Sequence, residues 1–197
     1  MLKISPNNLS YVLRSIPNFL WPLKWYIIKK SLYKVGANFK FGYNSEFADH
    51  RCIEIGNNVF MGLNTVINTT VLVKIYDDVM FGRGVTIMGG DHNINFVGKP
   101  MRYIKSGGKN TPIIIQKDAW IGSNVTILKG VTIGEGTVIG AGSVVTKSQP
   151  PYSICVGNPC KPIKQRFSSS DLELHLKTVK SNLTVTSVLD QYKQLSI

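Results

Sequence analysis

The 197-residue chain is long enough to enclose one sizeable core, which excludes a large multi-domain machine. Its 43% apolar and 17% charged content is typical of a globular protein and excludes a disordered chain. Twenty-three basic against eleven acidic residues give a net charge of +12, which favours an anionic partner such as nucleic acid, a membrane surface or a phosphorylated cofactor.

Residues 1–34 form an N-terminal segment that combines aromatic and basic side chains, and the first acidic residue of the chain is Glu46. Large aromatics at helical spacing usually serve packing, which favours a helix that caps the following domain or packs on a neighbouring subunit. The same composition also suits an amphipathic helix in a membrane interface, where rings lie at headgroup depth and cations meet anionic lipid. Both interpretations stay open.

Targeting signals and cysteine usage point to a reduced compartment. The N-terminal apolar stretches are broken by charge and proline, so no signal peptide or membrane-spanning run is expected. Cys52, Cys155 and Cys160 are an odd number without metal-ligand spacing. We expect a cytoplasmic protein without disulfides, with contact to the inner membrane face through the N-terminal segment as the alternative.

Residues 35–150 carry an internal repeat with a period of six residues. Neither a helix, with period 3.6, nor a half-buried strand, with period 2, explains it. A chain that turns every six residues does, with glycine and asparagine at the corners and each coil hydrogen-bonded to the next. The spacing therefore predicts a parallel β-helix, an all-β solenoid, rather than a sandwich with accidental spacing. The apolar positions are Val35, Phe41, Phe47, then Ile55, Met61, Ile67, Val73, then, after a two-residue slip, Ile75, Phe81, Ile87, and finally Ile115, Ile121, Ile127, Ile133, Ile139 and Val145.

Residues 89–111 interrupt the repeat, and an excursion of this length inside a compact repeat favours a functional loop. The loop contains Asp91 and His92, and an imidazole titrates where proton transfer near neutrality needs it. His92 is therefore the candidate catalytic residue. His50, in an early repeat, and His175, near the C-terminus, are expected to be structural or surface residues.

Residues 151–197 form a C-terminal extension, because Pro150, Pro151 and Pro159 end the coil. A solenoid has an apolar end that must be covered. Ser170 and Glu173 have the spacing of a capping box, so short helices are predicted over 171–180 and 186–195.

The motifs AWIG, VTIG, IGAGSVVTK and GNPCKPIK lie within residues 112–166. This stretch resembles the hexapeptide-repeat acetyltransferases, whose fold is a left-handed parallel β-helix, and is most similar to the sugar and surface-polysaccharide O-acetyltransferases such as the maltose and galactoside enzymes. The resemblance covers about residues 50–166. It implies a left-handed coil, a homotrimer with active sites between subunits, and acetyl-coenzyme A (acetyl-CoA) as co-substrate.

The resemblance also implies roles for individual residues. His92 would be the general base, the backbone N–H of Ser123 an oxyanion donor, and Trp120 an apolar wall beside the reacting groups or a packing residue between subunits. The residues matching the cofactor track are Gly82, Ser123, Ala141, Thr146, Lys147, Lys161 and Lys164, of which the last two are also interpretable as solvated surface lysines. The candidate acceptor contacts are Asn64, Asp91, Arg102 and Tyr103, with Met101 and Lys105 beside them in the loop.

The function expected from these features is transfer of acetyl from acetyl-CoA to a sugar hydroxyl during assembly of a surface polysaccharide, an O-antigen or capsule. A xenobiotic O-acetyltransferase of the same fold and a non-catalytic β-helix scaffold are the alternatives. A metal-dependent hydratase like the gamma-class carbonic anhydrases would need several converging histidines, which three dispersed ones do not supply, so no metal is expected. Nucleic-acid binding would rest on charge alone and is not expected.

Overall fold

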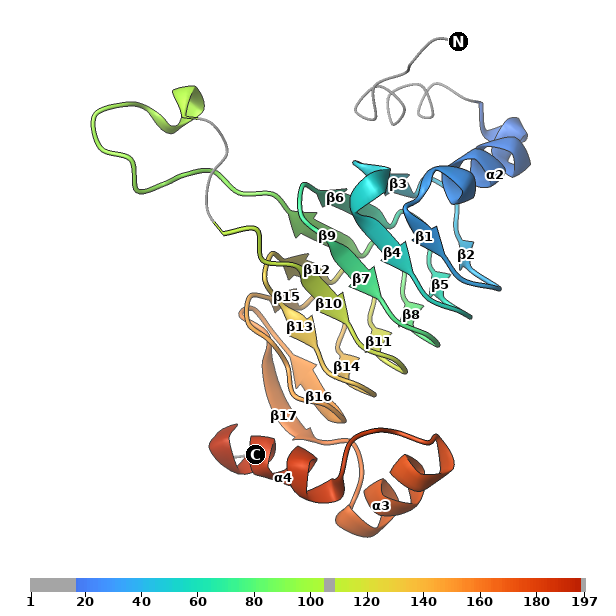
Figure 1. Cartoon of the computed structure of the whole chain (residues 1–197), viewed down its shortest axis with the longest axis vertical. Helices are drawn as coiled ribbons and strands as arrows, with labels where there is room; N and C mark the ends of the chain where they lie inside the picture. The colour runs from blue at the N-terminus through green and yellow to red at the C-terminus, as the bar shows by residue number, and fades with distance from the viewer. Residues whose placement is uncertain (1–16, 105–108, 196–197) are drawn as a thin grey trace.

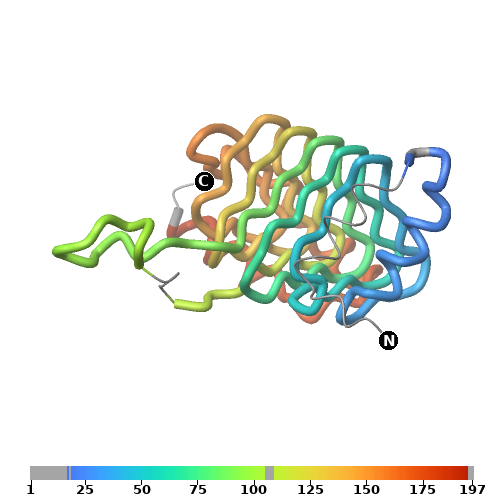
Figure 2. Tube along the Cα trace, turned by 90° about the horizontal axis from the view of Figure 1, so that it is seen from above, coloured from blue at the N-terminus to red at the C-terminus, as the bar shows by residue number. Residues whose placement is uncertain are grey.

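The computed structural model describes residues 17–104 and 109–195, and shows a parallel β-helix of stacked three-sided coils (Figure 1). Seen from above, the coils lie one behind another and a single long loop leaves the stack (Figure 2). Each side of the coil contributes its strands to one sheet, so the three sides form sheets A, B and C.

Sheet A contains β1 (Lys34–Val35), β4 (Ile53–Ile55), β7 (Val73–Ile75), β10 (Ile113–Ile115) and β13 (Thr132–Ile133). Sheet B contains β2 (Lys40–Phe41), β5 (Phe60–Met61), β8 (Met80–Phe81), β11 (Trp120–Ile121), β14 (Val138–Ile139), β16 (Ser153–Val156) and β17 (Lys161–Gln165). Sheet C contains β3 (Glu46–Phe47), β6 (Val66–Thr69), β9 (Thr86–Gly89), β12 (Thr126–Leu128) and β15 (Val144–Val145). All pairings are parallel except that of β16 with β17.

The six-residue period has the predicted cause. The aliphatic side chains of the repeat point into the coil, and Ile115, Ile121 and Ile127 are fully buried. Backbone groups pair with the coil above or below, as where the Gly82 N–H donates to the Ile121 carbonyl at 2.7 Å. Asn58 and Asp78 occupy corners with a positive φ, a conformation that asparagine and aspartate tolerate.

The two-residue slip in the repeat is an enlargement of one corner. Ile55 pairs with Ile75 across a coil of 75 − 55 = 20 residues, whereas Ile115 pairs with Ile133 across a coil of 133 − 115 = 18 residues. The extra residues lie between β6 and β7, where sheet C leads into sheet A. The 89–111 loop leaves the next coil at the same corner, between β9 and β10 (Figure 1).

The N-terminal end of the solenoid is covered by the short 3-10 helix η1 (Asn18–Leu20) and by α2 (Trp21–Ser31). Trp21 packs edge-on against Phe41, with ring centroids 5.6 Å apart, and Trp25 stacks on the same ring. At the end of α2, Ser31 hydrogen-bonds Nδ1 of the buried His50, which lies in the 3-10 helix η2 (His50–Cys52). The inner face of α2 therefore caps the core, as the packing interpretation predicts, whereas residues 1–16 of that segment lie outside the described residues.

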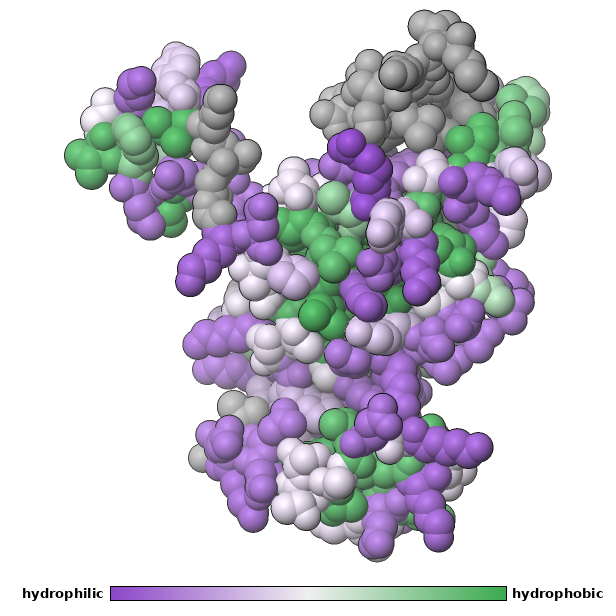
Figure 3. Space-filling view, viewed as in Figure 1, coloured by the Kyte–Doolittle hydropathy of each residue, from purple (hydrophilic) through white to green (hydrophobic). Residues whose placement is uncertain are grey.

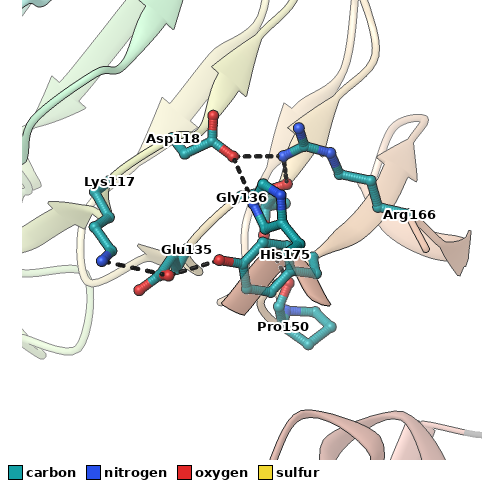
Figure 4. Close-up of polar contacts among 9 residues, drawn as sticks. Lys117, Asp118, Glu135, Gly136, Pro150, Arg166 and His175 are labelled. Carbon is teal, nitrogen blue, oxygen red and sulfur yellow. Dashed lines mark hydrogen bonds and ion pairs between the residues drawn. The ribbon is translucent and has the colours of Figure 1, made fainter. Parts of the chain in front are cut away.

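The C-terminal end is covered by the β16–β17 hairpin, α3 (Ser169–Thr178) and α4 (Val185–Leu195), which enclose a small second core. Arg166 joins this cap to the solenoid by donating to Asp118 at 2.7 Å and to the Gly136 carbonyl at 2.9 Å (Figure 4). His175 of α3 lies 3.9 Å from the same carboxylate.

The two C-terminal helices were predicted within two residues of their bounds, but the predicted capping box is wrong. Ser168, not Ser170, caps α3, since its hydroxyl accepts from the Asp171 N–H at 3.2 Å. Ser168 has extended backbone geometry, as an N-cap residue does, while Ser170 already lies inside the helix.

Neither membrane-spanning helices nor disulfides are found in the described parts of the chain. No helix there is long and apolar enough to cross a bilayer. The three cysteines are free thiols, and Cys155 and Cys160 are buried.

Candidate active site

The loop that interrupts the repeat forms one wall of a pocket of about 900 Å³ at the corner where sheet C leads into sheet A. The residues that line it are Asn68, Thr70, Met88, Gly90, Asp91, His92, Ile94, Met101 and Arg102. The ends of strands β6 and β9 supply the floor of this pocket, and the loop supplies its wall. Three of the predicted site residues, Asp91, His92 and Arg102, are brought together here.

The start of the loop is fixed by an ion pair with the next coil. Lys129, directly after β12, approaches the Asp91 carboxylate at 2.9 Å, and the other Asp91 oxygen accepts the His92 backbone N–H at 3.2 Å. The Lys129 ammonium lowers the pKa of Asp91, so this carboxylate is ionised near neutrality. The pair therefore ties the backbone of His92 to the rigid solenoid.

The other two histidines are held in structural positions, as the sequence indicated. His50 is buried under α2, and burial lowers its pKa below the ordinary value of 6.5. His175 packs against the rings of Tyr152 and Phe167 in the C-terminal cap. Neither lines the pocket that contains His92.

Gly82, Ser123 and Ala141 lie in one column, at the corner where sheet B leads into sheet C. A Cβ on Gly82 would lie 2.6 Å from the Ser123 backbone nitrogen, and one on Gly122 would lie 2.6 Å from that of Ala141. Such distances are too short for any side chain, so glycine at these positions is required by the close approach of the coils. The Ser123 N–H has no acceptor among the described residues, which leaves it available to a ligand.

Trp120 lies on sheet B and forms an exposed row with Phe60 and Met80. The three side chains are about half exposed, at 51%, 50% and 50%, and they stand on neighbouring strands in register. We refer to Phe60, Met80 and Trp120 as the sheet B row. An apolar row of this kind on a sheet face is typical of a protein–protein contact.

The remaining predicted residues lie outside the pocket and the column. Thr146 and Lys147 follow β15, on the same edge of sheet C as His92 but two strands away, and both are exposed. Lys161 and Lys164 are exposed on β17. Asn64 occupies the turn between β5 and β6 at φ 59°, Tyr103 is exposed in η3 (Met101–Tyr103), and neither lines the pocket, while Lys105 lies outside the described residues.

His92 and Ser123 lie on opposite edges of sheet C. Ser123 precedes β12, while Lys129, which holds the root of the His92 loop, follows it. Six residues of extended chain at ~3.3 Å each separate the two edges by roughly 15–20 Å. His92 and Ser123 therefore do not meet within one chain; we refer to the regions around them as the two half-sites.

The pocket also contains residues that the sequence analysis did not select, namely Asn68, Thr70, Met88, Gly90 and Ile94, and it depends on Lys129. The repeat itself could have indicated two of these residues, Thr70 and Lys129. Ile67, Ile87 and Ile127 are equivalent repeat positions, so the residues just after them, including Thr70 and Lys129, fall on the corner from which the loop emerges.

Comparison with known proteins decides the family. Residues 112–147 match the family model "Bacterial transferase hexapeptide (six repeats)". The galactoside O-acetyltransferase of Escherichia coli K12 is 33% identical over 170 residues, which cover 81% of this chain and 76% of that protein. The chain belongs to the hexapeptide-repeat acetyltransferases. Its fold is accordingly the left-handed β-helix that the motifs implied.

Two further similarities bear on this member of the family. A solved galactoside acetyltransferase in complex with coenzyme A has a TM-score of 0.71 and 31% identity, covering 85% of this chain and 82% of that one. A probable macrolide acetyltransferase of Lysinibacillus sphaericus is 47% identical over 83 residues, which are 42% of this chain and 46% of that protein. The chain thus spans about half the length of some curated relatives that it matches.

Proposed function

We propose that the protein is an acetyl-CoA-dependent O-acetyltransferase that acts on a hydroxyl of a saccharide. The observation that carries the proposal is His92, which lines the pocket on the solenoid of an acetyltransferase family and has its backbone anchored by Asp91 and Lys129. The exposed lysines Lys147, Lys161 and Lys164 supply positive charge for the phosphates of the co-substrate.

The proposed reaction begins with proton removal at the acceptor. The His92 imidazole takes the proton of the attacking hydroxyl, and the hydroxyl oxygen forms a bond with the thioester carbonyl carbon. The tetrahedral intermediate carries an oxyanion, to which the free Ser123 N–H donates. The carbon–sulfur bond then breaks, the imidazolium returns the proton to the sulfur, and the acetyl ester and free coenzyme A are released.

A homotrimer is part of the proposal, because the mechanism needs both half-sites. His92 and Ser123 lie on opposite edges of sheet C, so the His92 edge of one subunit must face the Ser123 edge of another. The sheet B row supplies an apolar surface for such a contact, and Trp120 within it would border the thioester.

We further propose a cytoplasmic role in the assembly of a surface polysaccharide, with the outer face of α2 in contact with the membrane on which lipid-linked saccharides are built. That face exposes Leu23 and Tyr26, and the preceding η1 exposes Phe19 and Leu20. Figure 3 shows apolar surface over this end of the molecule.

Replacement of His92 tests the proposed function. His92→Ala should lower kcat for acetyl transfer by about 10²-fold or more and leave acetyl-CoA affinity nearly unchanged, since a base acts mainly in the transition state. Thiol release with a panel of saccharide acceptors and calorimetry with coenzyme A measure the two quantities. Asn95→Ala, an exposed change in the same loop, is the control. Wild-type kcat in the His92 variant would remove this residue from the mechanism.

A second candidate function is acetylation of a xenobiotic hydroxyl. It is favoured by the 47% identity to the probable macrolide acetyltransferase over 83 residues. Macrolides and other hydroxyl-bearing antibiotics in the same acceptor panel distinguish the two functions, because only the preferred class will show saturable thiol release.

A further inference from the structure

The pocket around His92 contains a positive charge that no described residue compensates. Arg102 lines the pocket and makes no hydrogen bond or ion pair with any described residue. The other charged pocket residue, Asp91, is held by Lys129 at 2.9 Å. Asp91 and Lys129 therefore neutralise each other, and the Arg102 guanidinium has no described counter-ion.

The sequence around Arg102 offers no other partner. Between His92 and Lys117 there is no aspartate or glutamate, while Lys99, Arg102, Lys105 and Lys109 are basic. A guanidinium carries five donors in a planar fork that matches a carboxylate or a phosphate, and such charge-assisted bonds are about twice as strong as neutral ones. An arginine in this position selects for an anion on whatever fills the pocket.

The rest of the pocket suits the body of a sugar. Met88, Ile94 and Met101 provide an apolar wall for the C–H face of a ring, and Asn68 and Thr70 bring amide and hydroxyl groups for its hydroxyls. The pocket lies at the opposite edge of sheet C from the Gly82–Ser123–Ala141 column, so Arg102 is not grouped with that part of the cofactor track.

We propose that the acceptor is an anionic saccharide, and that Arg102 binds its carboxylate or phosphate while His92 faces the hydroxyl to be acetylated. The inference rests on the proposed function, because it assigns the acceptor class of that same site. It distinguishes this chain from a transferase for neutral sugars.

Matched acceptor pairs test the proposal. Methyl glucuronoside is compared with methyl glucoside for the carboxylate arm, and a sugar 1-phosphate with its methyl glycoside for the phosphate arm. The wild-type protein should prefer the anionic member of one pair by about tenfold or more in kcat/KM, and the preference should fall with added salt. The pair that shows the preference identifies the anionic group.

The variant Arg102→Met should raise KM for the preferred anionic acceptor by about tenfold and leave KM for its neutral counterpart and for acetyl-CoA unchanged. Lys99→Met removes the same charge from an exposed loop position that does not line the pocket, and should change none of these values. Saturation-transfer NMR of the same saccharides gives binding without turnover, with the same order of affinities expected.

Failure of this inference differs from failure of the proposed function. Equal or better use of the neutral acceptors, or an Arg102→Met defect confined to acetyl-CoA, would overturn the anionic acceptor while transfer itself persists. If no acceptor is turned over, NMR binding that favours neutral sugars or is insensitive to Arg102→Met overturns it as well. Absence of coenzyme A binding in calorimetry would instead refute the transferase proposal.

Discussion

Lys129 is a single side chain of the solenoid that holds the start of the loop containing His92, the proposed base. It contacts Asp91, which in turn accepts the backbone N–H of His92, so we expect Lys129 to affect the proposed reaction through the position of His92. Its own side chain is largely buried, at 17% exposure, whereas that of Asp91 is 56% exposed. The rigid partner is thus the lysine on the coil, and the loop is the partner that is held.

Loss of this lysine should affect turnover more than stability. We expect Lys129→Met to lower kcat about tenfold with little change in melting temperature. Displacement of the proposed base, His92, by a fraction of an ångström reduces stabilisation of the transition state without changing the fold. Lys117→Met, which breaks the 3.7 Å pair with Glu135 near the C-terminal cap, is the matched control and should retain kcat. A pH–rate profile separates a positioning role of Lys129 from a merely structural one. Partial rescue of kcat by Lys129→Arg would support the positioning role, and an unchanged kcat in Lys129→Met would contradict it.

At the scale of elements, α2 has two apolar faces. Trp21, Trp25 and Ile28 on the inner face pack against the first coil, which accounts for the capping role. The outer face is exposed, and the helix has no acidic residue. Of its lysines, Lys24 is buried, Lys29 donates to the Phe39 carbonyl and Lys30 is exposed. The two interpretations of this segment are therefore compatible, since capping uses one face and lipid contact would use the other.

Vesicle flotation tests the outer face. The wild-type protein should float with vesicles that contain phosphatidylglycerol at low salt and less so at high salt, because apolar burial and charge attraction act together. The double variant Leu23→Glu with Tyr26→Ser should stay unbound, whereas Leu174→Glu, an exposed apolar position on α3, should float normally. No flotation of the wild type would exclude the lipid role of α2.

Much of the fold could be predicted because a period of six leaves few alternatives, and Ile115 through Val145 obey it without a break. The N-cap of α3 was predicted at Ser170 and is Ser168, since both serines suit a cap and only backbone geometry separates them. The residues that line the pocket could not be predicted in full, because they depend on which coils become neighbours. Thr70 and Lys129 are 59 residues apart, from 129 − 70, and both lie beside the loop because β6 and β12 are the two neighbours of β9 in sheet C.

On the scale of the whole molecule, the proposed mechanism makes assembly a condition for activity, because His92 and Ser123 lie on opposite edges of sheet C. Trp120→Glu combined with Met80→Glu places two like charges in the sheet B row, which should convert the proposed trimer to monomers and abolish thiol release while the coil stays folded. Light scattering with size-exclusion chromatography gives the mass, and circular dichroism checks the fold. Leu174→Glu should leave both mass and activity intact. Full activity of a monomeric double variant would contradict a site shared between subunits.

The corner between β9 and β10 has a consequence for how such proteins diversify. Ile87 of β9 pairs directly with Ile127 of β12 although the whole 89–111 loop lies between them in the sequence. The pairing of these strands therefore does not depend on the residues of the loop. Insertions there can be lengthened, shortened or exchanged without any strand losing its neighbour. Changes in this loop can therefore alter the pocket while the paired coils on both sides of it stay the same.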